Sequence, residues 1–202
     1  MNYSFEFEHQ RAARKKIIIR VAIIIVEVIV VILAAFLLTH KGMVVFTVSG
    51  QDMAPTLNNG DRILINKLSY RIHSIKRNDI VVVKQSGAEH NYFSVERVIG
   101  LPGEKVQIIN GEVYIDDEKY EEKYHFPEME NGGLALESIV LDDDEYFLLC
   151  DNRNSGEDSR NANVGNVTKA EIIGKAWIRL NTVELVSFIS TVNDQKEDAS
   201  SE

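Results

Sequence analysis

Two acidic residues, Asp52 and Glu96, stand inside two short motifs that also contain glycine and proline. The first motif, residues 48–57, reads VSGQDMAPTL, and the second, residues 96–104, reads ERVIGLPGE. If the fold brings the two carboxylates face to face, they could share a proton and activate water, or hold a hard cation. The alternative is that each carboxylate is only solvated, as acidic side chains usually are.

A third motif, residues 151–160, reads DNRNSGEDSR and directly follows Cys150. Cys150 is the one cysteine of the chain, so no intramolecular disulfide can form. We expect it to be a small buried residue rather than a reactive thiol. The cysteine and the five scattered histidines do not have zinc-binding spacing, and the sequence predicts no metal and no cofactor.

In this order the three motifs resemble those of type I signal peptidases, membrane-anchored proteases that remove signal peptides with a serine nucleophile and a lysine base. The family's pattern is G-x-S-M-x-P-T-L, then K-R-V-I-G-L-P-G, then G-D-N-R-x-x-S-x-D-S-R. The resemblance places Asp52 at the nucleophile position and Glu96 at the base position. It places Gly156 where a small hydroxyl residue positions the lysine.

The Ser–Lys mechanism needs a neutral lysine amine that takes the proton from the serine hydroxyl, and donors that hold the oxyanion. A carboxylate such as that of Asp52 is a poor nucleophile toward an amide, and Glu96 has no amine. We therefore expect that no catalytic residue is intact, because nucleophile, base and helper are lost together.

The other residues of the three motifs match the family's pattern, apart from Cys150 in place of a glycine. The resemblance implies two structural ion pairs behind the site, Arg97 with Asp151 and Asp158 with Arg160. A cleft that retains its shape but has lost its catalytic groups suggests a role in binding rather than catalysis. The predicted binding cleft is flanked by an acidic excursion, residues 118–138, which could be a mobile flap. The cleft residues are Gly50, Asp52, Met53, Pro55 and Glu96.

Residues 17–39 are almost entirely apolar, and as a helix these 23 residues would span about 34 Å, enough to cross a membrane. The basic cluster before them predicts that residues 1–16 are cytoplasmic and that the chain is a single-pass protein of the cell membrane. Arg20 and Glu27 interrupt the segment on one helical face. Glu27 is either a protonated side chain without a specific role or a polar contact for another transmembrane helix.

The sequence after the anchor predicts a mainly β, signal-peptidase-like ectodomain of antiparallel sheets over residues 40–188, followed by a polar tail over residues 189–202. Asn110-Gly111 predicts a two-residue type I′ hairpin turn. The expected strands are Val44–Val48, Arg62–Asn66, Ile80–Lys84, Phe93–Ile99, Lys105–Ile109, Val113–Ile115, Glu145–Leu149 and Ile172–Leu180.

The formal net charge is −9, and residues 1–16 carry +2, so the ectodomain is acidic and nucleic acid is excluded as a partner. Some Gram-positive relatives with the nucleophile and base replaced stand beside pilin and sortase genes and assist pilus assembly. The resemblance therefore implies a non-catalytic membrane protein that binds a pilin or another exported precursor as a chaperone or scaffold, with a sortase or an active signal peptidase as a further partner.

Two alternatives remain open. One is an active signal peptidase in which Asp52 and Glu96 provide an altered mechanism. The other is a regulator that competes with an active paralogue for precursors, or pairs with it through Glu27.

Overall fold

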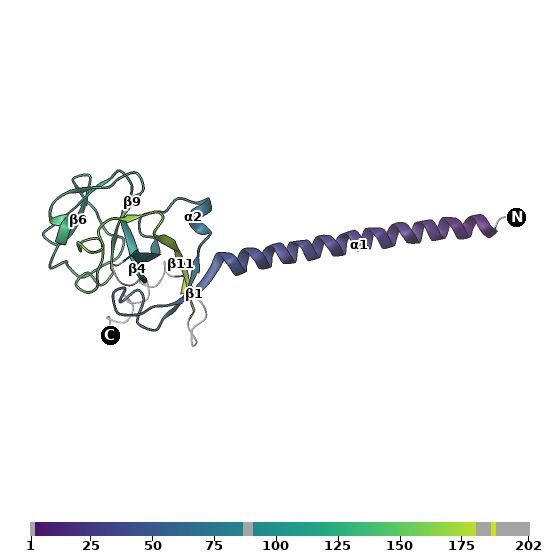
Figure 1. The fold of residues 1–202 in the computed structure, drawn as a ribbon, viewed down its shortest axis with the longest axis horizontal. Helices are drawn as coiled ribbons and strands as arrows, with labels where there is room; N and C mark the ends of the chain where they lie inside the picture. Colours follow the sequence, from purple (N-terminus) through teal and green to yellow (C-terminus); the bar gives the residue numbers. More distant parts are fainter. Residues whose placement is uncertain (1–2, 87–90, 181–186, 189–202) are drawn as a thin grey trace, which may run out of the picture. The chain divides into compact units, whose positions relative to one another are not determined.

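The computed structural model describes residues 3–86, 91–180 and 187–188 of the 202-residue chain, which form two compact units. The first unit is the long helix α1, Tyr3–Gly42 (Figure 1). Its segment Lys15–Phe36 is long and apolar enough to cross a membrane, which confirms the prediction of one apolar N-terminal helix. The predicted polar tail, residues 189–202, lies outside the described residues.

The second unit begins at Met43 and contains two antiparallel sheets, which confirms the predicted mainly β class (Figure 1). In the larger sheet the strands follow the order β1-β2-β11-β3-β4-β9-β10, and β12 pairs with β11. Their bounds are β1 Met43–Thr47, β2 Arg62–Asn66, β11 Ile172–Leu180, β3 Ile80–Ser86, β4 Asn91–Gly100, β9 Glu145–Leu149, β10 Val167–Thr168 and β12 Ser187–Phe188.

The smaller sheet follows the order β7-β6-β5-β8, with a short α-helix and a 3₁₀ helix elsewhere in the unit. Asn110 and Gly111 join β5 and β6 with φ angles of 52° and 79°, as the predicted type I′ turn requires. The bounds are β5 Lys105–Ile109, β6 Glu112–Ile115, β7 Glu118–Lys119, β8 Ile139–Val140, α2 Ser69–Ile72 and η1 Gly133–Leu136.

Strand β3 shows how the sequence divides the core. Successive side chains of a strand point to opposite faces of its sheet. Val82 packs into one apolar cluster with Met53 and Val95, whereas Val81 and Val83 pack into another cluster on the other face. The unbroken run Ile-Val-Val-Val is therefore explained by burial on both faces. Strand β3 also pairs with its neighbour β4 along a continuous antiparallel register, from Ile80 with Arg97 to Ser86 with Asn91.

The acidic excursion is packed rather than free. Met129 and Ala135 are buried in the apolar cluster of the smaller sheet. The backbone N–H of Glu130 donates to Oδ1 of Asn154 at 3.0 Å, and the N–H of Leu134 donates to the carbonyl of Arg160 at 2.8 Å. These contacts correct the interpretation of residues 118–138 as a mobile flap, because the segment contributes side chains to the core. The acidic composition of the segment gave no indication of this burial.

Candidate functional site

A groove of about 440 Å³ opens between the end of β1, the first motif, the start of β4 and the third motif. The structure thus brings the first and third motifs together, although about a hundred residues separate them in sequence. The residues that line the groove are Phe46, Val48, Ser49, Asp52, Met53, Tyr92, Phe93, Ser94, Val95, Gly156 and Glu157.

One backbone edge of β4 borders this groove. Strand β3 pairs with residues Asn91 to Arg97 of β4. On the other side of β4, strand β9 pairs only from Arg97 onward. In the described part of the chain, residues 91–96 therefore have a sheet partner on one side only. Their second edge carries backbone donors and acceptors that an extended peptide can pair with.

Asp52 stands on the wall of the groove and is half-buried. Its carbonyl accepts a hydrogen bond from the backbone N–H of Asn152 at 2.9 Å, which ties the first motif to the third. Of the other predicted cleft residues, Met53 also lines the groove, Gly50 lies beside the Asp52 carboxylate, and Pro55 is exposed outside the lining.

Gly156 is in direct contact with Asp52. A β-carbon built on Gly156 would lie 2.7 Å from Cγ of Asp52 and 2.9 Å from its Cβ, closer than real side chains approach each other. Any side chain at position 156 would therefore collide with the Asp52 side chain. The glycine at position 156 therefore leaves the room that the Asp52 side chain occupies.

This contact predicts a specific loss of stability. Gly156→Ala should lower the free energy of unfolding by about 1–3 kcal/mol more than Gly165→Ala, because only the first places a methyl group against another side chain. Both glycines have positive φ, 86° and 66°, and a β-carbon on Gly165 meets nothing within 4 Å. Gly165→Ala thus measures the backbone cost alone, about 1–2 kcal/mol. Chemical unfolding of the full chain in detergent compares the two variants, and equal losses would contradict the contact.

Glu96 is completely buried, which corrects its prediction as a cleft residue. Tyr92, Ser94 and Glu96 alternate along β4 and share one face, and Ser94 covers the carboxyl from the groove side. The Ser94 hydroxyl donates to Oε1 of Glu96 at 2.6 Å, and Nε2 of Gln85 donates to the same oxygen at 3.3 Å. Oε2 of Glu96 has no hydrogen-bond partner among the described residues.

Burial raises the pKa of Glu96 to about 7. The negative charges of Asp158 and Asp52 raise this pKa further, whereas the hydrogen bonds from Ser94 and Gln85 oppose the rise. The Asp52 charge thus acts on Glu96 across the groove wall. Near neutral pH the carboxyl group of Glu96 is therefore partly protonated.

Behind the groove, Arg97 and Asp151 form a buried, bidentate ion pair. Nε and Nη2 of Arg97 each donate to one oxygen of Asp151 at 2.7 Å. The Thr56 hydroxyl donates to the same carboxylate at 2.5 Å, and Nη1 of Arg97 donates to the carbonyl of Asn78. The structure therefore links the first, second and third motifs through one carboxylate.

Asp158 and Arg160 form a second ion pair, with Nε and Nη2 of Arg160 each 2.8 Å from an oxygen of Asp158. The Asp158 carboxylate also accepts the backbone N–H of Cys150 at 3.1 Å. Cys150 is buried, and burial raises the pKa of its thiol well above the usual range. A thiol in this state is structural and poorly reactive.

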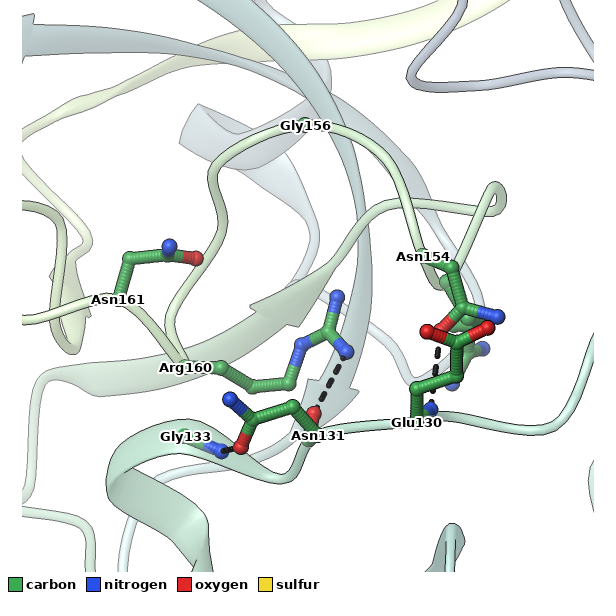
Figure 2. Close-up of a pocket in the computed structure, with 8 residues that line it drawn as sticks. Glu130, Asn131, Gly133, Asn154, Gly156, Arg160 and Asn161 are labelled. Atoms are coloured by element: carbon green, nitrogen blue, oxygen red, sulfur yellow. Dashed lines mark hydrogen bonds between the residues drawn. The ribbon is translucent and has the colours of Figure 1, made fainter.

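A second pocket is also bordered by Gly156, which lines both cavities (Figure 2). Figure 2 shows Arg160 between Asn161 and Asn131, with its guanidinium donating to the Asn131 carbonyl. Sequence reasoning did not single out Arg153, which also lines this pocket, is buried and pairs with Glu122 at 2.5 Å. The position of Arg153 in the third motif could have indicated its importance. Its partner Glu122 lies in the acidic excursion, where no sequence pattern distinguishes it from the other acidic residues.

The chain is similar to known proteins over most of its length. The profile of the family described as signal peptidase, peptidase S26, matches residues 17–181. A signal peptidase I from Bacillus amyloliquefaciens is 37% identical over 136 residues, which are 64% of this chain and 71% of that protein. Signal peptidase I T from Bacillus subtilis is 34% identical over 149 residues, which are 70% of this chain and 76% of that protein.

Among solved structures, a signal peptidase I from Enterococcus faecalis aligns with 28% identity and a TM-score of 0.42, over 51% of this chain and 97% of that one. The family profile covers far more than half of the chain and includes all three motifs. The chain therefore belongs to the signal peptidase family, peptidase S26.

Proposed function

We propose that this protein is a non-catalytic member of its family that binds exported precursor proteins in the groove without cutting them. The observation that carries the proposal is the state of Glu96. The base position holds a buried carboxyl bound by Ser94, and the described residues that line the groove include no lysine. A neutral amine beside a serine hydroxyl is what the family mechanism requires.

The groove supports a binding role. A precursor segment in extended conformation can pair with residues 91–96 of β4 through backbone hydrogen bonds, which depend on no catalytic side chain. Phe46 and Phe93, whose ring centroids lie 6.3 Å apart in an edge-on arrangement, provide apolar contacts for side chains of the bound segment. Shape and backbone pairing would give affinity while the peptide bond stays uncut.

The proposal includes the setting of the protein. The basic residues before the helix support a cytoplasmic N-terminus and an extracytoplasmic β unit, on the side where precursors would emerge from the membrane. We propose pilin precursors as clients and pilus assembly as the process, by similarity to relatives in which the same two positions are replaced. The groove then serves as a chaperone or scaffold site.

One observation favours a second candidate, an active peptidase with an altered mechanism. Asp52 contributes to the raised pKa of Glu96, so the two carboxyl groups are close enough to influence each other electrostatically. Pairs of carboxyl groups that share a proton activate water in some proteases. In this structure Ser94 lies between Glu96 and the groove, which separates the carboxyl from a bound peptide.

Binding in the groove is tested with two matched variants. Phe93→Ala removes an exposed apolar side chain from the groove, and Val140→Ala removes one from the edge of the smaller sheet. Phe93→Ala should weaken capture of a purified precursor about thirtyfold, because burial of a large apolar side chain contributes about 2 kcal/mol. Val140→Ala should leave capture unchanged. If both variants weaken capture equally, or if neither weakens it, the precursor does not bind in the groove.

A further inference from the structure

Helix α1 carries an acidic side chain in the middle of its apolar segment, and groove binding gives this residue no role. Within the segment Lys15–Phe36, Glu27 comes twelve residues after the first residue and nine before the last. At the rise of an α-helix it lies about 18 Å and about 14 Å from the two ends, near the centre of a hydrocarbon core about 30 Å thick. Ionisable residues at this depth face a partner rather than lipid.

The described part of the chain does not supply this partner. Figure 1 shows α1 as one uninterrupted helix, and it is the one described segment long and apolar enough to cross a membrane. Glu27 is exposed on its surface. Arg20 is the nearest basic residue, but it precedes Glu27 by seven residues, about 10 Å along the axis, whereas side chains pair within a helix at spacings of three or four. A partner for Glu27 is therefore expected on a second helix.

A copy of the same helix matches Glu27 in depth and in chemistry. Every copy of the chain enters the membrane in the same orientation, because the same flanking charges set it. Two parallel copies in register thus place Glu27 opposite Glu27, as a two-fold interface requires. A neutral carboxyl group has both a donor and an acceptor, so two of them can satisfy each other in an apolar medium. A second copy therefore supplies a matching group at the required depth.

The neighbours of Glu27 on the helix form a seam that suits such a pair. Residues at alternating spacings of three and four share one face of a helix, and on this face they are Ile23, Glu27, Val30 and Ala34, all exposed. The β-branched side chains are already restricted to one rotamer, and a small residue lets two helices approach closely. One polar residue in such a seam fixes the register and the number of helices. Arg20 lies one heptad earlier, near enough to the membrane end for its long side chain to reach the headgroups.

We infer that α1 associates with a second copy of itself in the membrane, as a parallel, in-register pair in which the two Glu27 carboxyl groups bond each other. The inference goes beyond the proposed function, because it concerns the anchor and does not depend on what the groove binds. A pair of anchors holds two β units at one place in the membrane, which raises the local concentration of any site that they carry.

Disulfide trapping of the purified full chain in phosphatidylcholine vesicles tests the seam. Val30→Cys places a thiol on the seam, and the matched control Val28→Cys places one at nearly the same depth on the opposite side of the helix. The native Cys150 is buried and common to both variants. Mild oxidation should give a covalent dimer with Val30→Cys and little with Val28→Cys, and this difference should persist as lipid dilutes the protein. Equal trapping of both variants would indicate random collisions and overturn the inference.

Substitutions of Glu27 in the Val30→Cys background test the role of its carboxyl group. Glu27→Leu should lower the initial rate of trapping about tenfold at a protein-to-lipid ratio where the dimer is the minor species, which is the effect of one interhelical hydrogen-bonded contact. Glu27→Gln should keep most of the rate, because an amide is also both donor and acceptor. An unchanged rate in Glu27→Leu would overturn the inference, since apolar packing alone would then hold the helices. A purified protein that stays monomeric at every ratio would also overturn it and leave a helix of another protein as the partner of Glu27.

Discussion

Asp151→Asn is expected to lower the free energy of unfolding by about 3–5 kcal/mol, because it leaves the charge of Arg97 buried without a full counter-ion. Both partners are almost inaccessible, with 2% of the Arg97 side chain and 0% of the Asp151 side chain exposed. Asparagine also has only one oxygen, and the aspartate accepts from Thr56 as well as from Arg97. Chemical unfolding of the full chain in detergent, followed by Trp177 fluorescence, measures the loss.

The matched control is Asp117→Asn. Asp117 pairs with Lys105 at 2.5 Å, but 72% of its side chain is exposed, and exposed ion pairs contribute about 0–1 kcal/mol. A loss for Asp151→Asn as small as that for Asp117→Asn would mean that the ion pair behind the groove does not hold the three motifs together.

Glu96→Gln is expected to stabilise the protein above pH 7 by about 3 kcal/mol. The pKa of Glu96 is about 7 in the folded chain and has an ordinary value of 4.5. At about 1.36 kcal/mol per pKa unit, ionisation of the buried group costs about 3 kcal/mol of folding free energy. Glutamine keeps the oxygen that accepts from Ser94 and has no charge to desolvate.

The sign of the pH dependence follows from proton binding. Between about pH 4.5 and 7 the folded protein holds the Glu96 proton more tightly than the unfolded chain does, so this group destabilises the fold progressively as the pH rises. The difference in unfolding free energy between Glu96→Gln and the unaltered protein should therefore grow across this window and level off above it. A difference that is constant from pH 4 to 8 would show that Glu96 is not desolvated.

Local sequence patterns predicted the strands well. The bounds of β2, β5, β9 and β11 agree with the expected ranges, because each strand is a β-branched or aromatic run ended by turn residues. Strand β4 extends two residues earlier than predicted, to Asn91, because its pairing with β3 continues that far. Pairing over a whole ladder is a tertiary property that a strand's own residues do not specify.

The site was predicted less completely than the fold. The identity of positions 52, 96 and 156 followed from the motifs, but the burial of Glu96 did not. An acidic residue in a strand predicts exposure, and here the opposite holds because Ser94 and Gln85 bind the carboxyl from one side and the sheet covers it. The contact between Gly156 and Asp52 also required coordinates, because about a hundred residues separate the two positions.

The coupling of positions 52, 96 and 156 bears directly on whether the protein is an enzyme. Asp52 fits beside residue 156 only because that residue is glycine, and the Glu96 carboxyl is sealed from the groove by a serine. If the proposed function holds, we therefore expect that restoration of one family residue would not give peptidase activity. A lysine at position 96 would still lack a serine to activate, and a serine at position 52 would still lack its base.

The most direct test is cleavage of an exported preprotein, preferably a pilin precursor, by the purified full-length protein in liposomes. A family member with the Ser–Lys pair serves as the positive control, and Asp52→Ala tests the chemistry. The proposed function predicts no cleavage by this protein while it still captures the precursor in a pull-down. Cleavage that disappears in Asp52→Ala would contradict the proposal and make Asp52 and Glu96 a catalytic pair.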